Sequence, residues 1–310
     1  MSISSQVDIK ENMNIHGRKS KLNNSFFILG KKLFKSKTGL VGLIIVVSVC
    51  LLALLAPLIA PYNPSKINLE AMLIPPVWLD GGTSQHILGT DNLGRDILSR
   101  LIYGSQISIL VGVSSVVIAG VIGVTFGLIA GYYGGFVDNV IMSFVDAFLS
   151  VPTILFCLVF LSVLDPGILT LIFVIGVTKW VMYTRLVRSE TLSIREREYV
   201  KAAKSIGVRD FNIITKHIFP NVFSSVIVIS TLSVATTIIT ESSLSFLGLG
   251  IQPPAISWGI MLSEGRAYLA TSWWLSAFPG IAITITVLGI IFLGEWLRDL
   301  LDPRSNQRKS

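Results

Sequence analysis

The sequence predicts an all-α integral membrane protein with six transmembrane helices. Only 14% of its 310 residues are charged, whereas soluble domains carry about a quarter, and the mean hydropathy is +0.72. Apolar runs also recur along the chain, each near or above the roughly 20 residues that a helix needs to cross the hydrocarbon core. They occupy residues 38–60, 101–137, 141–164, 167–187, 221–247 and 273–294.

The first apolar run contains no charged residue and is expected to be the first transmembrane helix. It is longer than the roughly 7–15 apolar residues of a cleaved signal peptide, and a polar segment precedes it. The expected organisation is a cytoplasmic tail at 1–37, the first helix at 38–60, an extracytoplasmic loop at 61–105, a five-helix core at 106–297 and a cytoplasmic tail at 298–310.

Lysine and arginine indicate the orientation. If the N-terminal tail is cytoplasmic, twenty of these residues fall in cytoplasmic segments, and four, Lys66, Arg95, Arg100 and Arg266, fall outside. Cytoplasmic loops carry an excess of positive charge, so both termini are expected in the cytoplasm. Topology therefore accounts for the net charge of +7, and nucleic acid is not an expected partner.

Residues 86–108 of the outer loop, HILGTDNLGRDILSRLIYGSQIS, contain two acid–base pairs with a spacing of four. Asp91 precedes Arg95 and Asp96 precedes Arg100, the favourable order for ion pairs on a helix. Leucines and isoleucines make the opposite face apolar. An amphipathic helix at the outer surface is therefore expected to lead into the second span. The pairs are expected to be structural, because each carboxylate has its own arginine.

The second span carries a small residue at every fourth position from Ala119 to Gly135, including Gly123, Gly127 and Gly131. Helices associate in lipid mainly through close packing, so this stripe is expected to receive another helix. The alternative is that glycine is simply common in membrane helices.

The fifth span is rich in serine and threonine and contains Glu241. A carboxylate within a span usually faces a watery cavity or a partner, so Ser233, Thr237 and Glu241 are candidates for lining a polar pathway. The alternative is that the hydroxyls bond to their own helix and Glu241 lies near the outer interface. Asp146 is expected close to the inner interface, and Lys179 is expected to pair or to extend towards an interface.

Residues 189–220 form a charged insert between the fourth and fifth spans. Ser193 and Glu196 match a capping box that would start a helix, and Gly207 suits the left-handed residue that ends it. Asp210 can cap a second short helix that stops before Pro220. One face of the first helix is expected to carry Tyr199, Ala202, Ala203 and Ile206. That face suits close docking of a partner; a helix pair on the membrane surface is the alternative.

The insert resembles the cytoplasmic loop motif of ABC importer permeases: Glu-Ala-Ala, three residues, Gly, nine residues, then Ile-x-Leu-Pro. Ala202, Ala203, Gly207 and Pro220 match that motif. Lys201 stands where the motif has Glu, which puts in doubt any salt bridge that a Glu would make there. His217 and Phe219 replace the Ile and the Leu.

The similarity extends from about residue 38 to residue 303. The segments LAPLIAPYNP, LGTDNLGRDILSRLIYG, SFLGLGIQPPAISWGIMLSEG and GEWLRDLLDP resemble those of C-type permease subunits of dipeptide, oligopeptide and nickel importers. The segment IPPVWLDGG looks most like the dipeptide branch. Nickel or another small solute is the alternative cargo.

The resemblance implies a type I ABC importer permease fold in the cytoplasmic (inner) membrane of a bacterium, with a cytoplasmic coupling helix between spans 4 and 5. The implied partners are a homologous B-type permease subunit, two ATP-binding subunits that hold ATP and Mg, an extracytoplasmic solute-binding protein and membrane lipid. The residues implied in ATPase coupling are Glu198, Tyr199, Lys201, Ala202, Ala203, Gly207, Asp210 and Pro220.

The sequence is consistent with ATP binding by partner subunits and not by this chain. Gly30-Lys31 lacks the earlier glycine and the following hydroxyl of a phosphate-binding loop, so no nucleotide site is expected on this chain. No catalytic residue, metal site or cofactor is expected either, and Cys50 and Cys157 are expected to be buried thiols. The competing functions are a stand-alone secondary carrier with Glu241 as its ion site, and a membrane scaffold.

Overall fold

The computed structural model describes residue 33 and residues 36–301, and within them the chain is helical without a named strand. Residues 1–32, 34–35 and 302–310, which make up most of the tails predicted at 1–37 and 298–310, lie outside the described residues. Helices long and apolar enough to cross a membrane include α2 (Lys37–Leu54), α4 (Ile97–Tyr133), α7 (Ile168–Arg195) and α12 (Trp274–Leu301). The fifth such helix comprises α10 (Phe219–Phe246) and the segment leading into it from Asp210.

The third span differs from the continuous helix expected at 141–164. It consists of α5 (Gly135–Leu149) and α6 (Thr153–Val163), which meet at 84°. Pro152 lies at the break, where it lacks an N–H for the helix and disfavours helical backbone at the preceding residue. The described chain therefore has five candidate spans, or six if this bent pair counts as one.

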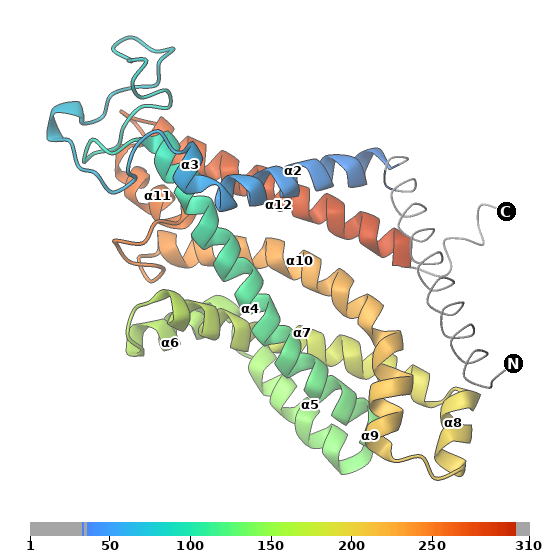
Figure 1. Ribbon diagram of the computed structural model, residues 1–310. Helices are drawn as coiled ribbons and strands as arrows, with labels where there is room; N and C mark the ends of the chain where they lie inside the picture. Colours follow the sequence, from blue (N-terminus) through green and yellow to red (C-terminus); the bar gives the residue numbers. More distant parts are fainter. Residues whose placement is uncertain (1–32, 34–35, 302–310) are drawn as a thin grey trace, which may run out of the picture.

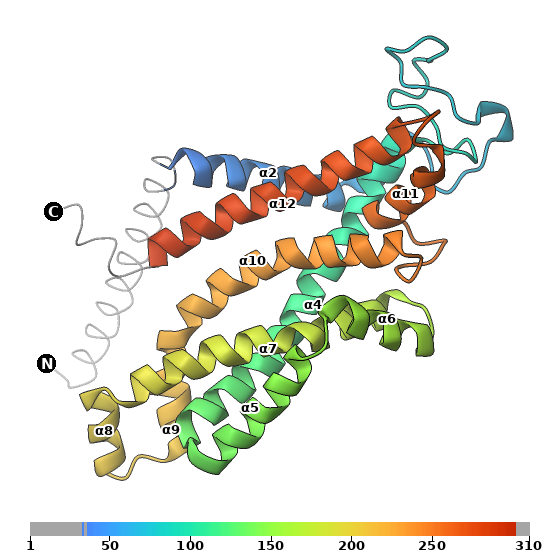
Figure 2. The ribbon, with the colours of Figure 1, turned by 180° about the vertical axis from the view of Figure 1, so that it is seen from behind.

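The helices form an elongated bundle in which α4 runs obliquely beside its neighbours (Figure 1). At one end lie α8 (Glu198–Ser205) and α9 (Asp210–Ile213), and we call this the insert end. At the other end, the loop end, lie α6, α11 (Trp258–Gly265) and the segment that contains η1 (Leu69–Ala71). The reverse view shows that α2 starts and α12 finishes towards the insert end (Figure 2).

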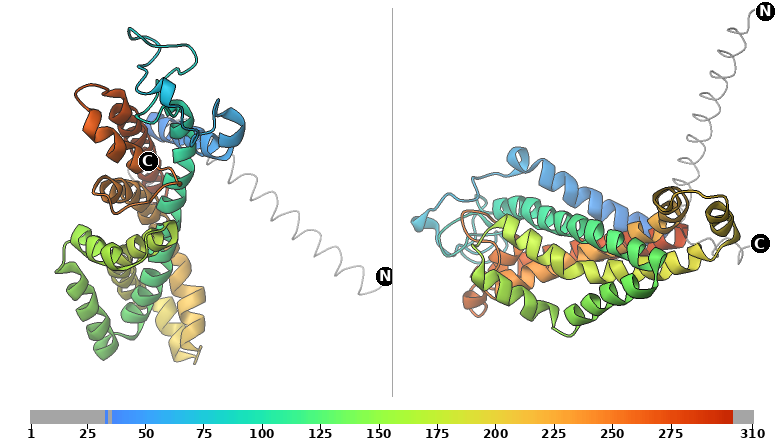
Figure 3. Two further views of the ribbon diagram at one scale, coloured as in Figure 1. Left: turned by 90° about the vertical axis from the view of Figure 1, so that its left-hand side faces the viewer. Right: turned by 90° about the horizontal axis from the view of Figure 1, so that it is seen from below.

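Close packing of α4 on α7 depends on the glycine stripe. A Cβ on Gly123 would lie 2.4 Å from the Trp180 carbonyl oxygen, and one on Gly127 would lie 2.7 Å from the Val187 Cβ. A Cβ on Gly131 would lie 2.6 Å from the Cβ of Thr191. Alanine is therefore too large at each of these positions unless the helices move apart. The two helices lie together along much of their length (Figure 3).

Ion pairs attach α5 to α7. Arg188 donates hydrogen bonds from two nitrogens to the Asp138 carboxylate, and its Nη2 lies 2.6 Å from Oδ2. Arg185 Nη2 donates to Asp146 Oδ1 at 2.6 Å. Asp146 thus has an arginine partner on the neighbouring helix, on the part of α7 that runs towards the insert.

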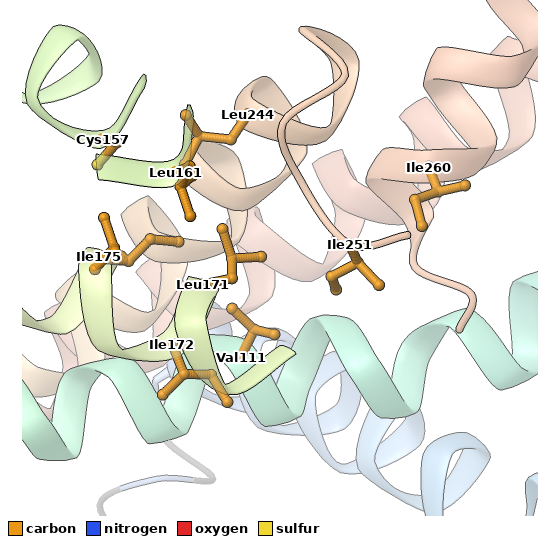
Figure 4. Close-up of a cluster of buried hydrophobic side chains, with 10 residues drawn as sticks. Val111, Cys157, Leu161, Leu171, Ile172, Ile175, Leu244, Ile251 and Ile260 are labelled. Atoms are coloured by element: carbon orange, nitrogen blue, oxygen red, sulfur yellow. The ribbon is translucent and has the colours of Figure 1, made fainter. Parts of the chain in front are cut away.

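A buried apolar cluster holds α6 against the rest of the bundle near the loop end (Figure 4). Leu161 of α6 joins Leu171 and Ile175 of α7 and Leu244 of α10. Cys157 is a buried free thiol in the same cluster, and Cys50 is a half-buried free thiol. The burial that α6 gains from these neighbours stabilises its position after the break at Pro152.

Residues 86–96 are not helical, which corrects the amphipathic helix expected over 86–108. The helix begins at Ile97, and Asp96 caps it by accepting a hydrogen bond from the Ser99 N–H at 2.8 Å. Gly89 and Gly94 have φ angles of +82° and +70°, and a Cβ on Gly94 would lie 1.8 Å from the Asn68 carbonyl oxygen. Tight turns against the preceding loop therefore override the helical pattern.

Candidate coupling surface and polar pathway

The insert begins later than the capping box predicted. Helix α7 continues through Ser193 to Arg195, and α8 starts at Glu198. The reason is packing, because Ile194 is buried in a cluster with residues of α4 and the insert. A π-helical turn, η2 (Ile214–Ile218), then joins α9 to α10.

Gly207 forms the elbow between the two insert helices. Its φ is +81°, in the left-handed region that favours glycine. The Val208 N–H donates to the Ala203 carbonyl and the Gly207 N–H to the Lys204 carbonyl, both at 3.1 Å. This pair of bonds is a Schellman motif, which satisfies carbonyls left free at the end of α8 and turns the chain back towards α9.

The insert divides into a buried face and an exposed apolar face. Val200 and Ala203 are buried against residues that include Ile213. The exposed apolar side chains of the two insert helices and their junction are Tyr199, Ala202, Ile206 and Phe211, which we call the docking patch. Ile206 is 80% exposed and Phe211 is 74% exposed. Ala203 of the predicted face thus points inwards, and Phe211 was missed because it belongs to the second helix. Clustered exposed apolar side chains among charged residues mark an interaction surface.

Two contacts attach the insert, residues 189–220, to the last turn of α4. Tyr132 Oη, in the last turn of α4, donates to Asp210 Oδ1 at 2.5 Å. Arg195 Nη1 donates to the carbonyl oxygens of Gly131 and Tyr132, at 3.2 and 2.9 Å. Asp210 is the first residue of α9 and accepts the hydrogen bond from Tyr132. Arg209 occupies the N-cap position that was expected for Asp210. Arg195 also places positive charge at the negative end of the α4 dipole.

Lys201 has a local partner. Its Nζ lies 2.9 Å from Glu196 Oε2 across the junction of α7 and α8. The hydrogen bond from Lys201 holds the pKa of the Glu196 carboxyl below its usual range. Both side chains are 60% exposed, so this is a surface pair. Glu198 opens α8, and Pro220 lies in the first turn of α10, where its missing N–H costs no helical bond.

The outer-loop charges form a cluster that differs from the two predicted pairs. Asp91 Oδ2 accepts from Arg95 Nε at 2.6 Å and also from Arg100. Glu264 of α11 lies 3.0 Å from Arg95 and 2.8 Å from Arg100. Asp91 and Arg95 therefore form an ion pair as expected, although they lie on a turn and not on a helix. The expected pair of Asp96 with Arg100 does not form, because Arg100 binds Asp91 and Glu264.

Asp96 instead interacts with His86 and Ser99, with 3.0 Å from its Oδ1 to His86 Nδ1. Glu264 was missed because it lies 169 positions from Arg95, and no local pattern connects residues at that separation. The cluster fixes the outer loop and the start of α4 to α11.

Helix α10 has two polar sides with different surroundings. Glu241 is fully buried, and its Oε1 accepts from Ser245 and Ser257, both at 2.8 Å. Ser233 and Thr237 are also buried, and the Thr237 hydroxyl donates to the Ser233 carbonyl at 2.7 Å. These three candidates thus face the interior of the chain in this structure, and their predicted role in the pathway stays a prediction.

The other polar side of α10 is open. Thr236 is exposed and Thr240 and Ser243 are half-buried. Lys179 of α7 donates from Nζ to Thr236 Oγ1 at 2.8 Å. Nearer the insert end, a groove of about 840 Å³ lies between α7, α10 and α12, and its lining includes Leu186, Glu190, Ser225, Leu232 and Arg298.

Residues 123–307 match the family model described as the inner membrane component of binding-protein-dependent transport systems. The chain belongs to this permease family. Residues 28–76 of the permease match a second model, the N-terminal transmembrane domain of oligopeptide transport permease C. The first match contains the insert and the glycine stripe, and the second contains α2.

Full-length relatives resemble the permease over most of its length. A di/tripeptide transport system permease protein of Pseudomonas aeruginosa is 39% identical over 87% of this chain and 89% of its own length. A dipeptide transport system permease protein of Haemophilus influenzae is 39% identical over 88% and 93%. One from Bacillus subtilis is 38% identical over 88% and 84%.

A solved structure supports the fold. A chain of the MetNI methionine ABC transporter, in an inward-facing conformation, aligns with a TM-score of 0.55. The alignment covers 66% of the permease and 96% of that chain at 18% identity. At this identity the likeness concerns the fold alone. Among the residues that the structure describes, no three His, Cys, Asp or Glu side chains gather as a metal site.

Proposed function

We propose that the chain forms half of the translocation pathway of an ATP-driven importer for dipeptides in a bacterial inner membrane. The names and the coverage of the peptide-transport relatives support the cargo class. In this role the chain pairs with a homologous B-type permease subunit and receives its cargo from an external solute-binding protein. Partner subunits bind ATP and Mg and hydrolyse the nucleotide.

The observation that carries the proposal is the docking patch. Tyr199, Ala202, Ile206 and Phe211 expose apolar surface at one end of a bundle of membrane-spanning helices. Exposed apolar surface of this kind is costly in water unless a partner covers it. An ATPase subunit covers it in our proposal, and the contacts of Tyr132 and Arg195 carry its movement to α4.

Both termini and the insert are cytoplasmic in this proposal. The excess of Lys and Arg in the insert and tails supports that orientation. The start of α2 and the end of α12 lie towards the insert end, which is consistent with it. Glu198, Lys201 and the Gly207 elbow then belong to the coupling surface with the patch.

A charge within the docking patch tests the proposal. Ile206→Asp and Phe211→Asp should each abolish co-purification of the ATPase subunits and dipeptide uptake, because a carboxylate would be buried at the contact. Ile67→Asp is the matched control, since Ile67 is an exposed apolar residue at the loop end. It should leave co-purification unchanged. Normal ATPase binding by both patch variants would contradict the proposed contact.

The cargo is tested with the assembled importer in proteoliposomes. Labelled dipeptide should accumulate only with ATP and the solute-binding protein, whereas Ni²⁺ should not. Accumulation by the purified chain alone would favour a secondary carrier. ATP-dependent accumulation of Ni²⁺ but not dipeptide would retain the importer and refute the peptide cargo.

A further inference from the structure

We propose that Lys179 binds the carboxylate of the transported solute midway along the membrane path. This inference rests on the proposed function, because it assigns a carboxylate-bearing cargo to a pathway of this chain. It concerns a different side of α10 from Glu241. The interaction is between the positive charge of the Lys179 ammonium and the negative charge of the solute carboxylate, inside the bilayer.

Lys179 lies deep within α7. It is 11 residues from the start of the helix at Ile168 and 16 from the end at Arg195, roughly 16 and 24 Å at 1.5 Å per residue. Towards the insert end, the first charged residue of α7 after Lys179 is Arg185, six residues or about 9 Å along the helix. Of the two outcomes expected for Lys179, pairing or extension towards an interface, the hydrogen bond to Thr236 corresponds to pairing.

The ammonium of Lys179 is incompletely compensated. Its described partner is the Thr236 hydroxyl, 2.8 Å away on α10, and none of the ion pairs formed by residues 36–301 includes it. A neutral hydroxyl does not neutralise a cation, and an uncompensated charge within a bilayer is costly. Such a residue usually faces a water-filled path and meets a charged group there.

The position of the pair relative to the groove supplies that path. Leu186 of α7 and Leu232 of α10 line the groove near the insert end. Met182, four residues before Leu186, is 66% exposed, and Thr236 follows Leu232 by one helical turn. The Lys179–Thr236 pair lies outside the groove lining, about two helical turns from Leu186 on α7 and one from Leu232 on α10. Helices α7 and α10 run side by side (Figures 1 and 2).

Hydroxyl groups continue beyond the pair towards the loop end. Thr240 and Ser243 follow Thr236 along the same side of α10, at steps of four and three residues. The chain covers this side only in part, since Thr236 is exposed and Thr240 and Ser243 are half-buried, whereas Thr237 and Glu241 are fully buried. A solute could pass from these hydroxyls to Lys179 and then into the groove. The C-terminal carboxylate of a short peptide is the group that an ammonium would hold there.

Uptake by the assembled importer tests the charge of Lys179. With saturating solute-binding protein, Lys179→Gln should lower the rate of dipeptide uptake about tenfold or more, the size expected when a charge-assisted hydrogen bond is lost. Lys179→Arg should retain most of the rate, and Lys179→Glu should abolish uptake because it repels the cargo. Lys66→Gln removes a lysine of the outer loop and is the matched control.

Two results would overturn the inference. Wild-type uptake by Lys179→Gln, in an importer whose wild type carries dipeptides, would refute it and leave the proposed function intact. Failure of Lys179→Gln to co-purify the second permease subunit would assign the carboxylate to that subunit. Absence of dipeptide uptake by the wild-type importer would instead refute the proposed function itself.

Thiol labelling gives a measurement that does not depend on uptake by the lysine variants. In a Cys50→Ser, Cys157→Ser background, Thr236→Cys should react with a charged methanethiosulfonate reagent, and dipeptide under turnover should slow the reaction. Thr237→Cys, the adjacent buried position, should not react. Equal labelling of the two positions, or labelling of Thr236→Cys that dipeptide does not slow, would refute a path along this side of α10.

Discussion

Tyr132 and Asp210 join two parts of the chain that lie 78 positions apart, through a hydrogen bond of 2.5 Å. Tyr132 lies in the last turn of α4, and Asp210 begins the second helix of the insert. Under the proposed function, a displacement of the insert would act on α4 through this hydrogen bond. The glycine stripe, on the same helix, then brings α7 with it.

Tyr132→Phe should weaken the coupling between ATP hydrolysis and transport. The variant removes one hydroxyl and leaves the ring in place, so the fold should persist while the insert loses a contact worth about 1–3 kcal/mol when its charged acceptor is counted. More ATP should be hydrolysed per dipeptide imported, measured in proteoliposomes. Tyr133→Phe is the control, because Tyr133 is 54% exposed. An unchanged ratio would show that this contact does not transmit movement.

Gly127→Ala should destabilise the permease by about 1–3 kcal/mol, because the added Cβ lies 2.7 Å from the Val187 Cβ and overpacks the interface. Thermal unfolding in detergent measures the effect. Gly120→Ala is the matched control on the same helix, where the nearest atom, on Tyr183, is 3.8 Å away. Equal melting temperatures for the two variants would contradict the proposed importance of close packing.

Asp91→Asn should be among the most destabilising conservative changes. It removes the carboxylate that Arg95 and Arg100 share, and the Arg100 side chain is only 2% exposed. Removal of one partner from a buried ion pair typically costs about 3–5 kcal/mol. The melting temperature should fall, and added salt should not restore it, because buried charges are poorly screened. Asp80→Asn, at an exposed position, should melt like the wild type.

The Lys201–Glu196 pair should depend on pH in a defined direction. Because Lys201 lowers the pKa of Glu196, the pair stabilises the folded state above the ordinary carboxyl range. That contribution is lost as the pH falls through the lowered pKa. The difference in melting temperature between wild type and Lys201→Gln should therefore be small at neutral pH and absent in acid. A difference that grows in acid would contradict this pairing.

Local patterns were sufficient for several features. Five of the six apolar runs correspond to helices long enough to cross a membrane, because hydropathy over some 20 residues is a property of a continuous segment. The left-handed φ of Gly207 is also local, since the residue after a short helix needs that conformation to turn the chain. The break at Pro152 had a local signal too, which the long apolar run around it obscured.

The tertiary structure determined which of several possible charge pairs form and which side of a polar helix is exposed. The spacing of Asp96 and Arg100 permits a helical pair, yet Arg100 binds Asp91, which lies between the turns at Gly89 and Gly94, and Glu264, which α11 supplies. Hydroxyls occur around much of α10, so composition could not distinguish the buried side of Glu241 from the open side of Thr236. Packing against α4 and α11 makes that distinction, through contacts between residues far apart in the sequence. The sequence by itself therefore determined the spans, the insert and the family, whereas the partners of each charge and the exposed side of each helix depended on the fold.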